Sequence, residues 1–387
     1  MEGDLIYINE WLRPIAWLYG LGVRTRNALF DMGLLKSRSF PIPIISVGNI
    51  TVGGTGKTPH TEYLIRLLRS QYKVAVLSRG YKRKSKGFVL SAPDTPMKMI
   101  GDEPFQMKQK YPDIHVAVDR DRCHGIDCLR QDPRSADTEV IILDDAYQHR
   151  YVKPGLNILL VDYHRMITED ALLPAGRLRE PQQSKARANV VIVTKCPQDI
   201  KPMGYRVIRK ALQLYPYQKL FFSTLRYSAM HQLFGQHTRS LNDLRQEEQV
   251  MLLTGIATPR QMMQDIQKYC RNVSPLPFSD HHDFSHKDVD KINRTFRAMR
   301  SPKTIITTEK DATRLLGTPG LEPEVKEALY VLPIEIEILQ NQQTLFNETI
   351  TGYVFKNSRD GILAQGQDDH TSHHGNHIRH RARQAGR

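Results

Sequence analysis

The sequence predicts an α/β fold: a doubly wound, mostly parallel sheet followed by a second, smaller α/β domain. From Pro41 onward, strand-like and helix-like stretches alternate as PIPIISVG, HTEYLIRLLRSQ and KVAVLSRG. Three later runs, VIILDD (140–145), LNILLVD (156–162) and NVVIVTK (189–195), are almost continuously apolar. Parallel strands that are buried on both faces have this composition. Alternating strands and helices therefore favour a parallel sheet with helices on both sides.

A second series of strand and helix patterns follows the first. It begins near KLFFSTL, continues through VMLLTGIATPRQMM and KTIITTEKDATRLL, and ends with YVLPIEIEIL. At 387 residues the chain also exceeds the roughly 250 to 300 residues at which a single core stops growing. We therefore expect a core domain over residues 41–215 and a smaller α/β domain over residues 216–355, which would cover the cleft as a lid.

The first 40 residues have an amphipathic pattern. The apolar residues with three- and four-residue spacing are Leu5, Ile8, Leu12, Ile15 and Leu18, and basic residues lie among them. This spacing predicts a helix, interrupted near Pro14. Both tryptophans of the chain, Trp11 and Trp17, also fall here. The helix would either lie in a bilayer interface or pack on the domain, because the period reports an apolar face and not what covers it.

The composition limits the kind of partner and argues against disulfides and a zinc site. The formal net charge of +14 indicates a negatively charged partner, such as a nucleic acid, an anionic membrane or a phosphorylated substrate. The four cysteines form no CxxC pair, so neither a disulfide framework nor a zinc site is indicated.

The chain lacks the pattern of an exported or membrane-spanning protein. No apolar run reaches the ~20 residues that a spanning helix needs, and the N-terminus lacks the pattern of a signal peptide. Residues 356–387 are polar and rich in histidine, so we expect a disordered tail.

The strongest motif is the string TVGGTGKT, between an apolar strand ending at Val47 and a helical stretch starting near Pro59. Strand, glycine-rich loop and helix are the context of a P-loop, so the fold class is P-loop NTPase-like. Its backbone N–H groups would cradle phosphates. Lys57 would reach the β- and γ-phosphates, and Thr58 would bind Mg²⁺. The predicted ATP-binding residues are Thr51, Val52, Gly53, Gly54, Thr55, Gly56, Lys57 and Thr58.

A metal at a P-loop needs an acidic partner, and VIILDDAYQHR supplies two. The apolar strand delivers Asp144 and Asp145 at its C-terminal end, where ligands bind in open α/β sheets. One aspartate would hold Mg²⁺ directly or through water, and the other would orient the metal or the incoming hydroxyl. We assign Asp144 to the metal and Asp145 to catalysis. Alternatively, the pair could cap the following turn.

The sequence favours ATP over GTP. Guanine-specific P-loop proteins carry [N/T]KxD after a strand, whereas here Thr194-Lys195-Cys196 is followed by Pro197. The string VGGTGKT also resembles the deviant P-loop of ParA-like ATPases, but Val52 stands where their signature lysine would be.

Several strings together resemble the tetraacyldisaccharide 4'-kinase family of lipid A biosynthesis. They are, in order, SVGNITVGGTGKTP, LSRGYKRK, GDEP (101–104), LDDAYQHR, LLPAGRLREP (172–181), FSDHHDF (278–284) and TTEKDA (307–312). The resemblance implies transfer of the ATP γ-phosphate to the 4'-hydroxyl of a tetraacylated disaccharide 1-phosphate. It also implies a peripheral enzyme at the cytoplasmic face of the inner membrane, with ATP and Mg²⁺ as cofactors and the lipid-linked disaccharide and the membrane surface as partners.

The resemblance also implies catalytic roles. Asp102, in GDEP, takes the position of the family's proposed catalytic base, and His281 that of its histidine partner, although the adjacent His282 could exchange roles with it. A carboxylate tuned by a histidine can accept the hydroxyl proton during in-line transfer. The alternatives are that Asp102 caps a helix and that His281 is an ordinary loop histidine.

Three arginines are candidates for holding the substrate phosphate: Arg79, Arg177 and Arg179. Arginine can clamp a phosphate with two parallel hydrogen bonds, but arginines paired with Glu180 or Asp162 would serve structure alone.

Two other functions remain open at this point. A switch ATPase would hydrolyse ATP slowly to regulate a membrane or protein partner. Binding of nucleic acid lacks a recognisable module, and the sequence indicates no obligate protein partner.

Overall fold

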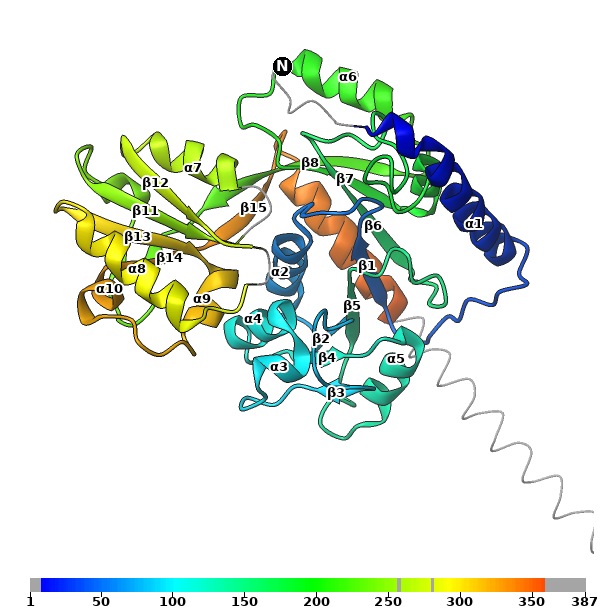
Figure 1. Ribbon diagram of the computed structural model, residues 1–387. Coiled ribbons are helices and arrows are strands. Elements are labelled where there is room, and N and C mark those ends of the chain that lie inside the picture. Colours follow the sequence, from blue (N-terminus) through cyan, green and yellow to red (C-terminus); the bar gives the residue numbers. More distant parts are fainter. Residues whose placement is uncertain (1–7, 256–258, 280–281, 359–387) are drawn as a thin grey trace, which may run out of the picture.

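The computed structural model describes residues 8–255, 259–279 and 282–358. In this part of the chain the strands form two sheets, one of nine strands and one of six (Figure 1). The larger sheet has the order β15-β8-β7-β6-β1-β5-β2-β4-β3, and only its edge strands β3 and β15 run antiparallel to their neighbours. Residue bounds of its strands are β1 (Ile44–Gly48), β2 (Val74–Ser78), β3 (Val89–Leu90), β4 (His115–Val118), β5 (Val140–Asp144), β6 (Leu156–Asp162), β7 (Val190–Thr194), β8 (Lys219–Tyr227) and β15 (Ile334–Ile338).

The helices and short helical turns follow the predicted alternation. Their bounds are η1 (Glu10–Leu12), α1 (Arg13–Asp31), α2 (Lys57–Leu68), α3 (Met97–Ile100), α4 (Asp102–Lys110), α5 (Arg122–Gln131), η2 (Gln182–Arg187), α6 (Pro202–Leu212), η3 (Leu241–Asp243), α7 (Pro259–Gln267), α8 (His286–Ala298), α9 (Glu309–Leu315) and α10 (Pro323–Ala328). Residues 343–358 are also helical.

Helices cover both faces of the larger sheet. Side chains alternate between the faces of a strand, so Ile45 and Val47 of β1 pack in one core together with α2 and the helix 343–358. Ile44, the residue before Ile45, points to the other face and belongs to a second core that includes α5. A third core contains Leu159 of β6 and Leu212 of α6. The prediction of a doubly wound, mostly parallel sheet is thus confirmed.

The smaller sheet has the order β10-β9-β14-β13-β11-β12, with β11 to β14 parallel. Its strands are β9 (Met230–Gln232), β10 (Thr238–Arg239), β11 (Gln249–Thr254), β12 (Asn272–Pro277), β13 (Lys303–Thr308) and β14 (Leu329–Leu332). The edge strand β12 contains Pro275 and Pro277, which lack the N–H that an inner strand would need. Two further cores pack around this sheet.

The boundary predicted at residue 216 does not coincide with the two sheets. Strand β8, which opens the predicted smaller domain, pairs in parallel with β7 of the larger sheet, and β15 pairs antiparallel with β8. The smaller sheet is therefore an insertion between β8 and β15. The run YVLPIEIEIL divides between the sheets at Pro333, whose carbonyl accepts a hydrogen bond from the amide of Ser228 at 3.1 Å. The two connections between the sheets thus lie side by side.

Helix α1 begins at Arg13 and is not interrupted at Pro14. Pro14 lies in its first turn, where a missing N–H costs no intrahelical hydrogen bond. Several apolar side chains of α1 face outward, although Ala16 and Phe30 are buried: Trp17 is 63% exposed and Leu18 is 62% exposed, and Trp11 just before the helix is 91% exposed. The predicted helical residues before Ile8 lie outside the described residues. The disordered tail predicted over residues 356–387 begins too early, because residues 356–358 continue the helix 343–358; the remainder, from residue 359, lies outside the described residues. Within the described residues no helix is both long and apolar enough to span a bilayer.

His60 joins α2 to the larger sheet and makes stability depend on pH. Its Nε2 lies 2.9 Å from the Ser223 hydroxyl of β8, and its Nδ1 lies 2.7 Å from the carbonyl of Gly56. Burial lowers the pKa of His60 from 6.5 to about 4, although the hydrogen bond with Gly56 opposes the shift. The unfolded chain consequently binds the proton more tightly than the folded protein.

We predict that the contribution of His60 to stability is fully present above pH 6.5 and is lost as pH falls toward about 4. Each pH unit within that window costs up to about 1.4 kcal/mol. Urea unfolding of the wild type and of His60→Gln across this range should show a difference in unfolding free energy that shrinks at low pH. His164→Gln, at an exposed position, controls for loss of a histidine as such. A difference that does not change with pH would contradict this role of His60.

Candidate functional site

The glycine-rich loop lies between the central strand β1 and helix α2. Gly53 and Gly56 adopt positive φ angles of 116° and 82°, a region that glycine enters at little cost. Gly56 is the N-cap of α2 and has no side chain to occupy the amides of the first turn. A Cβ atom added at Gly54 would meet no heavy atom within 4 Å, so there is open space above the loop. The loop and the first turn of α2 together present backbone N–H groups that can bind an anion.

Hydrogen bonds hold this loop in shape. The side-chain amide of Asn49 donates to the hydroxyls of Thr51 and Thr55 at 3.3 Å and 2.9 Å. The segment GRLREP lies along the other side of the loop, where the amide of Val52 donates to the carbonyl of Arg177 at 2.7 Å. The P-loop is thus braced by a segment more than a hundred residues further along the chain.

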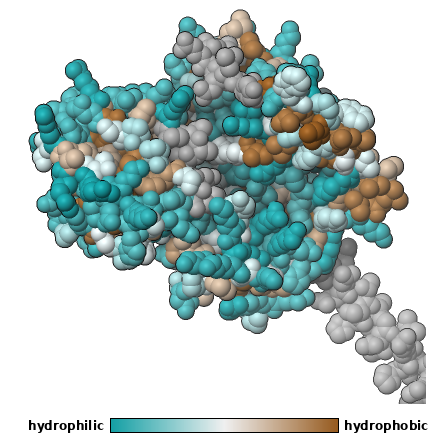
Figure 2. Space-filling view, viewed as in Figure 1, coloured by the Kyte–Doolittle hydropathy of each residue, from teal (hydrophilic) through white to brown (hydrophobic). Residues whose placement is uncertain are grey.

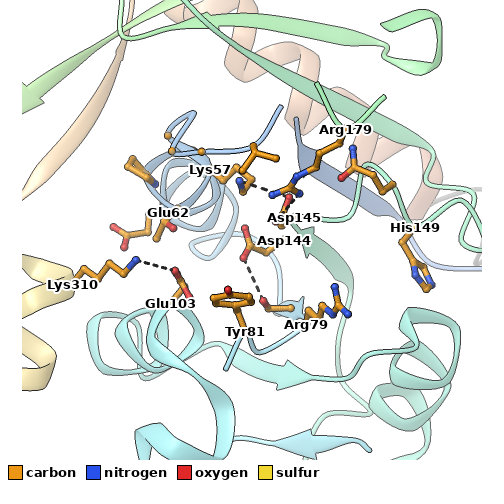
Figure 3. A pocket seen from close by; sticks show the side chains of 18 of the residues that line it. Lys57, Glu62, Arg79, Tyr81, Glu103, Asp144, Asp145, His149, Arg179 and Lys310 are labelled. Atoms are coloured by element: carbon orange, nitrogen blue, oxygen red, sulfur yellow. Dashed lines mark hydrogen bonds and ion pairs between the residues drawn. The ribbon is translucent and has the colours of Figure 1, made fainter. Parts of the chain in front are cut away.

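The two aspartates lie opposite the P-loop lysine. Asp144 pairs in register with Val47, since β5 is the neighbour of β1. Asp145 then adopts a positive φ of 47°, a conformation that aspartate tolerates better than most residues. Its carboxylate lies 3.7 Å from Nζ of Lys57 and 3.5 Å from a guanidinium nitrogen of Arg179. Figure 3 shows both cations converging on Asp145, with Asp144 beside it.

The carboxylates of Asp144 and Asp145 fit a divalent cation. Asp144 is buried and accepts from the hydroxyls of Thr61 at 3.2 Å and Ser78 at 3.4 Å. Burial and the nearby charges of Asp145 and Glu103 raise its pKa to about 6. Oδ1 of Asp145 is buried and accepts no hydrogen bond within the described residues. A cation would offset the repulsion of the two carboxylates and supply the missing partner.

A cleft of about 1740 Å³ opens above the P-loop and is lined by residues of both sheets. Gly53, Lys57 and Asp145 lie on one side, and Thr308, Glu309 and Lys310 of the string TTEKDA face them from the smaller domain. The cleft also reaches α1, where Tyr19, Val23 and Arg26 line it. It therefore extends from the phosphate cradle to the helix with the exposed tryptophan.

The three candidate arginines do not lie together. Arg79 and Arg179 line the cleft, whereas Arg177 is exposed and is not among the lining residues. Arg177 and Arg179 do not form the alternative ion pairs with Glu180 or Asp162. Glu180 pairs with Arg187 at 2.8 Å, and Asp162 pairs with Lys195 at 2.6 Å.

Asp102 lies at the start of α4, next to the cleft. Its neighbours Glu103 and Gln106 line the cleft, but Asp102 is not among the lining residues. Its carboxylate is paired with the guanidinium of Arg314 in α9 of the smaller domain. Arg314 also donates to the carbonyl of His282 at 3.1 Å. His281 lies outside the described residues. Arg314 thus links Asp102 to the segment that follows His281.

Near Asp102, further ion pairs join helices α2 and α4 of the larger domain to helix α9 of the smaller domain. Nζ of Lys110 lies 2.7 Å from the carboxylate of buried Glu62 and 2.6 Å from that of Glu309. Lys310 approaches Glu103 to 3.5 Å. Burial opposes the charge of Lys110, but Glu62 and Glu309 outweigh it and raise the pKa of Lys110 above its ordinary value. The faces of α2, α4 and α9 therefore meet through complementary charges.

Sequence reasoning missed two residues of the cleft. Arg122 is buried and donates to the carbonyls of Asp119 at 3.2 Å and Asp144 at 3.3 Å. Burial lowers its pKa to about 10. His149 lines the cleft, and burial and the charge of Arg122 lower its pKa to about 4. His149 belongs to the string LDDAYQHR, so its motif could have identified it. Arg122 starts α5 after β4, a strand that the sequence reasoning did not predict.

Comparison with known proteins places this cleft in a family. Residues 8–352 match the family model described as LpxK, tetraacyldisaccharide-1-P 4'-kinase. A protein named tetraacyldisaccharide 4'-kinase from Phocaeicola vulgatus is 61% identical over 361 residues, which cover 93% of this chain and 99% of that protein. The protein of the same name from Bacteroides fragilis strain ATCC 25285 is 54% identical, with 96% and 100% covered.

A solved structure agrees with these relatives. The crystal structure of LpxK from Aquifex aeolicus in complex with ATP is 28% identical, with a TM-score of 0.68, and the match covers 90% of this chain and 99% of that one. The family model and the two relatives span nearly the whole chain. The chain therefore belongs to the tetraacyldisaccharide-1-P 4'-kinase family.

Proposed function

We propose that the protein transfers the γ-phosphate of ATP to the 4'-hydroxyl of a tetraacylated disaccharide 1-phosphate. The observation on which this rests is the cleft itself. It joins a P-loop, buried Asp144 and half-buried Asp145 at one end to α1, with its exposed apolar side chains, at the other. Such a cleft suits a reaction between a nucleotide and an acceptor that stays in a membrane.

The P-loop and the aspartates supply the nucleotide end. The amides of the loop and of the first turn of α2 would bind the phosphates of ATP, and Lys57 would neutralise charge that develops on the γ-phosphate. Thr58 and Asp144 would hold Mg²⁺, which when bound offsets charge on the phosphates and holds them in line. Arg179, now beside Asp145, would turn to the phosphate once a cation neutralises that carboxylate.

Asp102 would accept the proton of the attacking hydroxyl. The hydroxyl oxygen forms a bond to the γ-phosphorus, the bond from that phosphorus to the β–γ bridging oxygen breaks, and ADP leaves. The proton passes to the carboxylate of Asp102, which His281 would orient. Arg314 of the smaller domain is paired with that carboxylate. When the lid closes, movement of α9 toward the cleft would therefore also move Asp102. Closure would also exclude water, the competing acceptor.

The acceptor would enter between α1 and the P-loop. Its phosphate would be held by Arg79 or Arg179, both of which line the cleft. Its acyl chains would remain in the bilayer on which α1 lies, because Trp11 and Trp17 are exposed and suited to an interface. The enzyme would then lie peripherally at the cytoplasmic face of the inner membrane.

We predict that Asp102→Asn strongly slows lipid phosphorylation without weakening ATP binding. Loss of a general base costs roughly 10²- to 10⁴-fold in kcat. The measurement is transfer of label from γ-³²P-ATP to the tetraacyldisaccharide 1-phosphate in detergent micelles, together with the Kd for ATP. Lys57→Ala should lose transfer as well, because the γ-phosphate is no longer neutralised.

Asp113→Asn is the matched control, since Asp113 follows α4 and forms a surface pair with Arg69. It should keep the wild-type rate. Transfer by Asp102→Asn at the wild-type rate would contradict the role of the base. If the wild type released inorganic phosphate and labelled no lipid, the kinase proposal itself would fail and the switch ATPase would replace it.

A further inference from the structure

Helix α6 carries apolar side chains on two opposite faces. Its inner face packs on the larger sheet through Ile208 and Leu212, both buried, with Tyr205 against Phe222. Its outer face presents Met203, which is 64% exposed, and Val207, which is 50% exposed. These two lie four residues apart and therefore form one stripe along the helix. The inner face accounts for folding, but the outer stripe has no role in the cleft or in the core.

The surroundings of this stripe are positively charged. Residues 201–213 contain Lys201, Arg206, Arg209 and Lys210 and no acidic residue. All four basic side chains are exposed. An apolar stripe bordered by basic residues suits an anionic lipid surface, because the apolar side chains enter the interface while the cations meet the head groups.

Helices α6 and α1 lie on the same face of the larger sheet. The core that holds Ile208 and Leu212 of α6 also includes Leu172 at its edge. Leu172 contacts α1 closely, since a Cβ atom added at Gly20 would lie 2.7 Å from its Cδ1. The helix 343–358 packs in the core on the opposite face. Figure 1 shows α6 near the start of α1, and in Figure 2 apolar surface lies over both helices.

We propose that α6 is a second membrane-contacting element that rests on anionic lipid beside α1. One amphipathic helix can turn about its own axis at an interface, whereas two contacts fix the orientation of the sheet. The opening of the cleft near α1 would then keep a constant position relative to the head groups. This inference concerns binding to lipid and does not depend on which acceptor the cleft phosphorylates.

The test is partition of the full chain into vesicles of phosphatidylcholine with and without phosphatidylglycerol, measured by flotation. Met203→Ser combined with Val207→Ser removes the stripe. Arg206→Glu combined with Lys210→Glu reverses two charges. The matched control is Leu316→Ser with Leu345→Ser: these residues are 54% and 48% exposed, and they lie in the smaller domain and on the helix of the opposite face.

We predict that both α6 variants lower the partition coefficient on anionic vesicles roughly tenfold or more, with an unchanged Kd for ATP. The control should bind as the wild type does. On vesicles of phosphatidylcholine alone, the charge variant should lose much less than the apolar variant. Partition equal to that of the wild type, or an equal loss in the control, would overturn the proposal. So would a loss of self-association in light scattering with lipid binding intact, because a second copy of the chain would then cover α6.

Discussion

The repulsion between the carboxylates of Asp144 and Asp145, at the carboxyl end of β5, is the constraint on which the site depends. Two adjacent carboxylates are held at the base of a cleft, one of them fully inside the protein, with its pKa raised to about 6. Lys57 and Arg179 approach Asp145 only to 3.7 Å and 3.5 Å, so their attraction falls short of a direct hydrogen bond. Without ligand, the positive charges of Lys57 and Arg179 therefore offset the negative charge of the carboxylates. The site is suited to accept a cation and phosphates together.

The backbone brings these charges together without long side chains. Strands β1 and β5 are neighbours in register, and a Cβ atom added at Gly48 would lie 2.7 Å from Cβ of Tyr147. Only glycine allows the end of β1 to lie so close to the turn after β5. The loop that bears Lys57 and the turn that bears Asp145 consequently face each other over a short distance. The segment of Arg179 reaches the same point through its backbone bonds to the P-loop.

The smaller sheet contributes to the site through ion pairs between residues that are distant in the sequence. Because it is inserted between β8 and β15, it is connected to the larger sheet by two adjacent crossings. Lys110 and Arg314 join α9 to α2 and α4 through carboxylates. Asp102 is thus paired with a residue of the smaller domain, and under the proposed mechanism closure of that domain would also position the base.

The elements predicted best from the sequence are those with local signals. The continuous apolar runs became the buried strands β5, β6 and β7, and the glycine spacing located the P-loop. Sheet membership of β8 and β15 could not be predicted, since their apolar pattern fits either sheet and only long-range pairing decides between them. The pairing of Asp102 with Arg314 was missed for the same reason: the residues are distant in the chain and meet only when the sheets pack. Arg122 was missed because its partners are backbone carbonyls.

Binding of Mn²⁺, measured by electron paramagnetic resonance with a non-hydrolysable ATP analogue, tests most directly whether the aspartates anchor the metal. The comparison is between the wild type, Asp144→Asn and Asp162→Asn, since Asp162 ends strand β6 of the same sheet but pairs with Lys195. The account predicts that Asp144→Asn weakens Mn²⁺ binding roughly tenfold or more while Asp162→Asn leaves it unchanged. Equal Mn²⁺ affinity in all three proteins would contradict it.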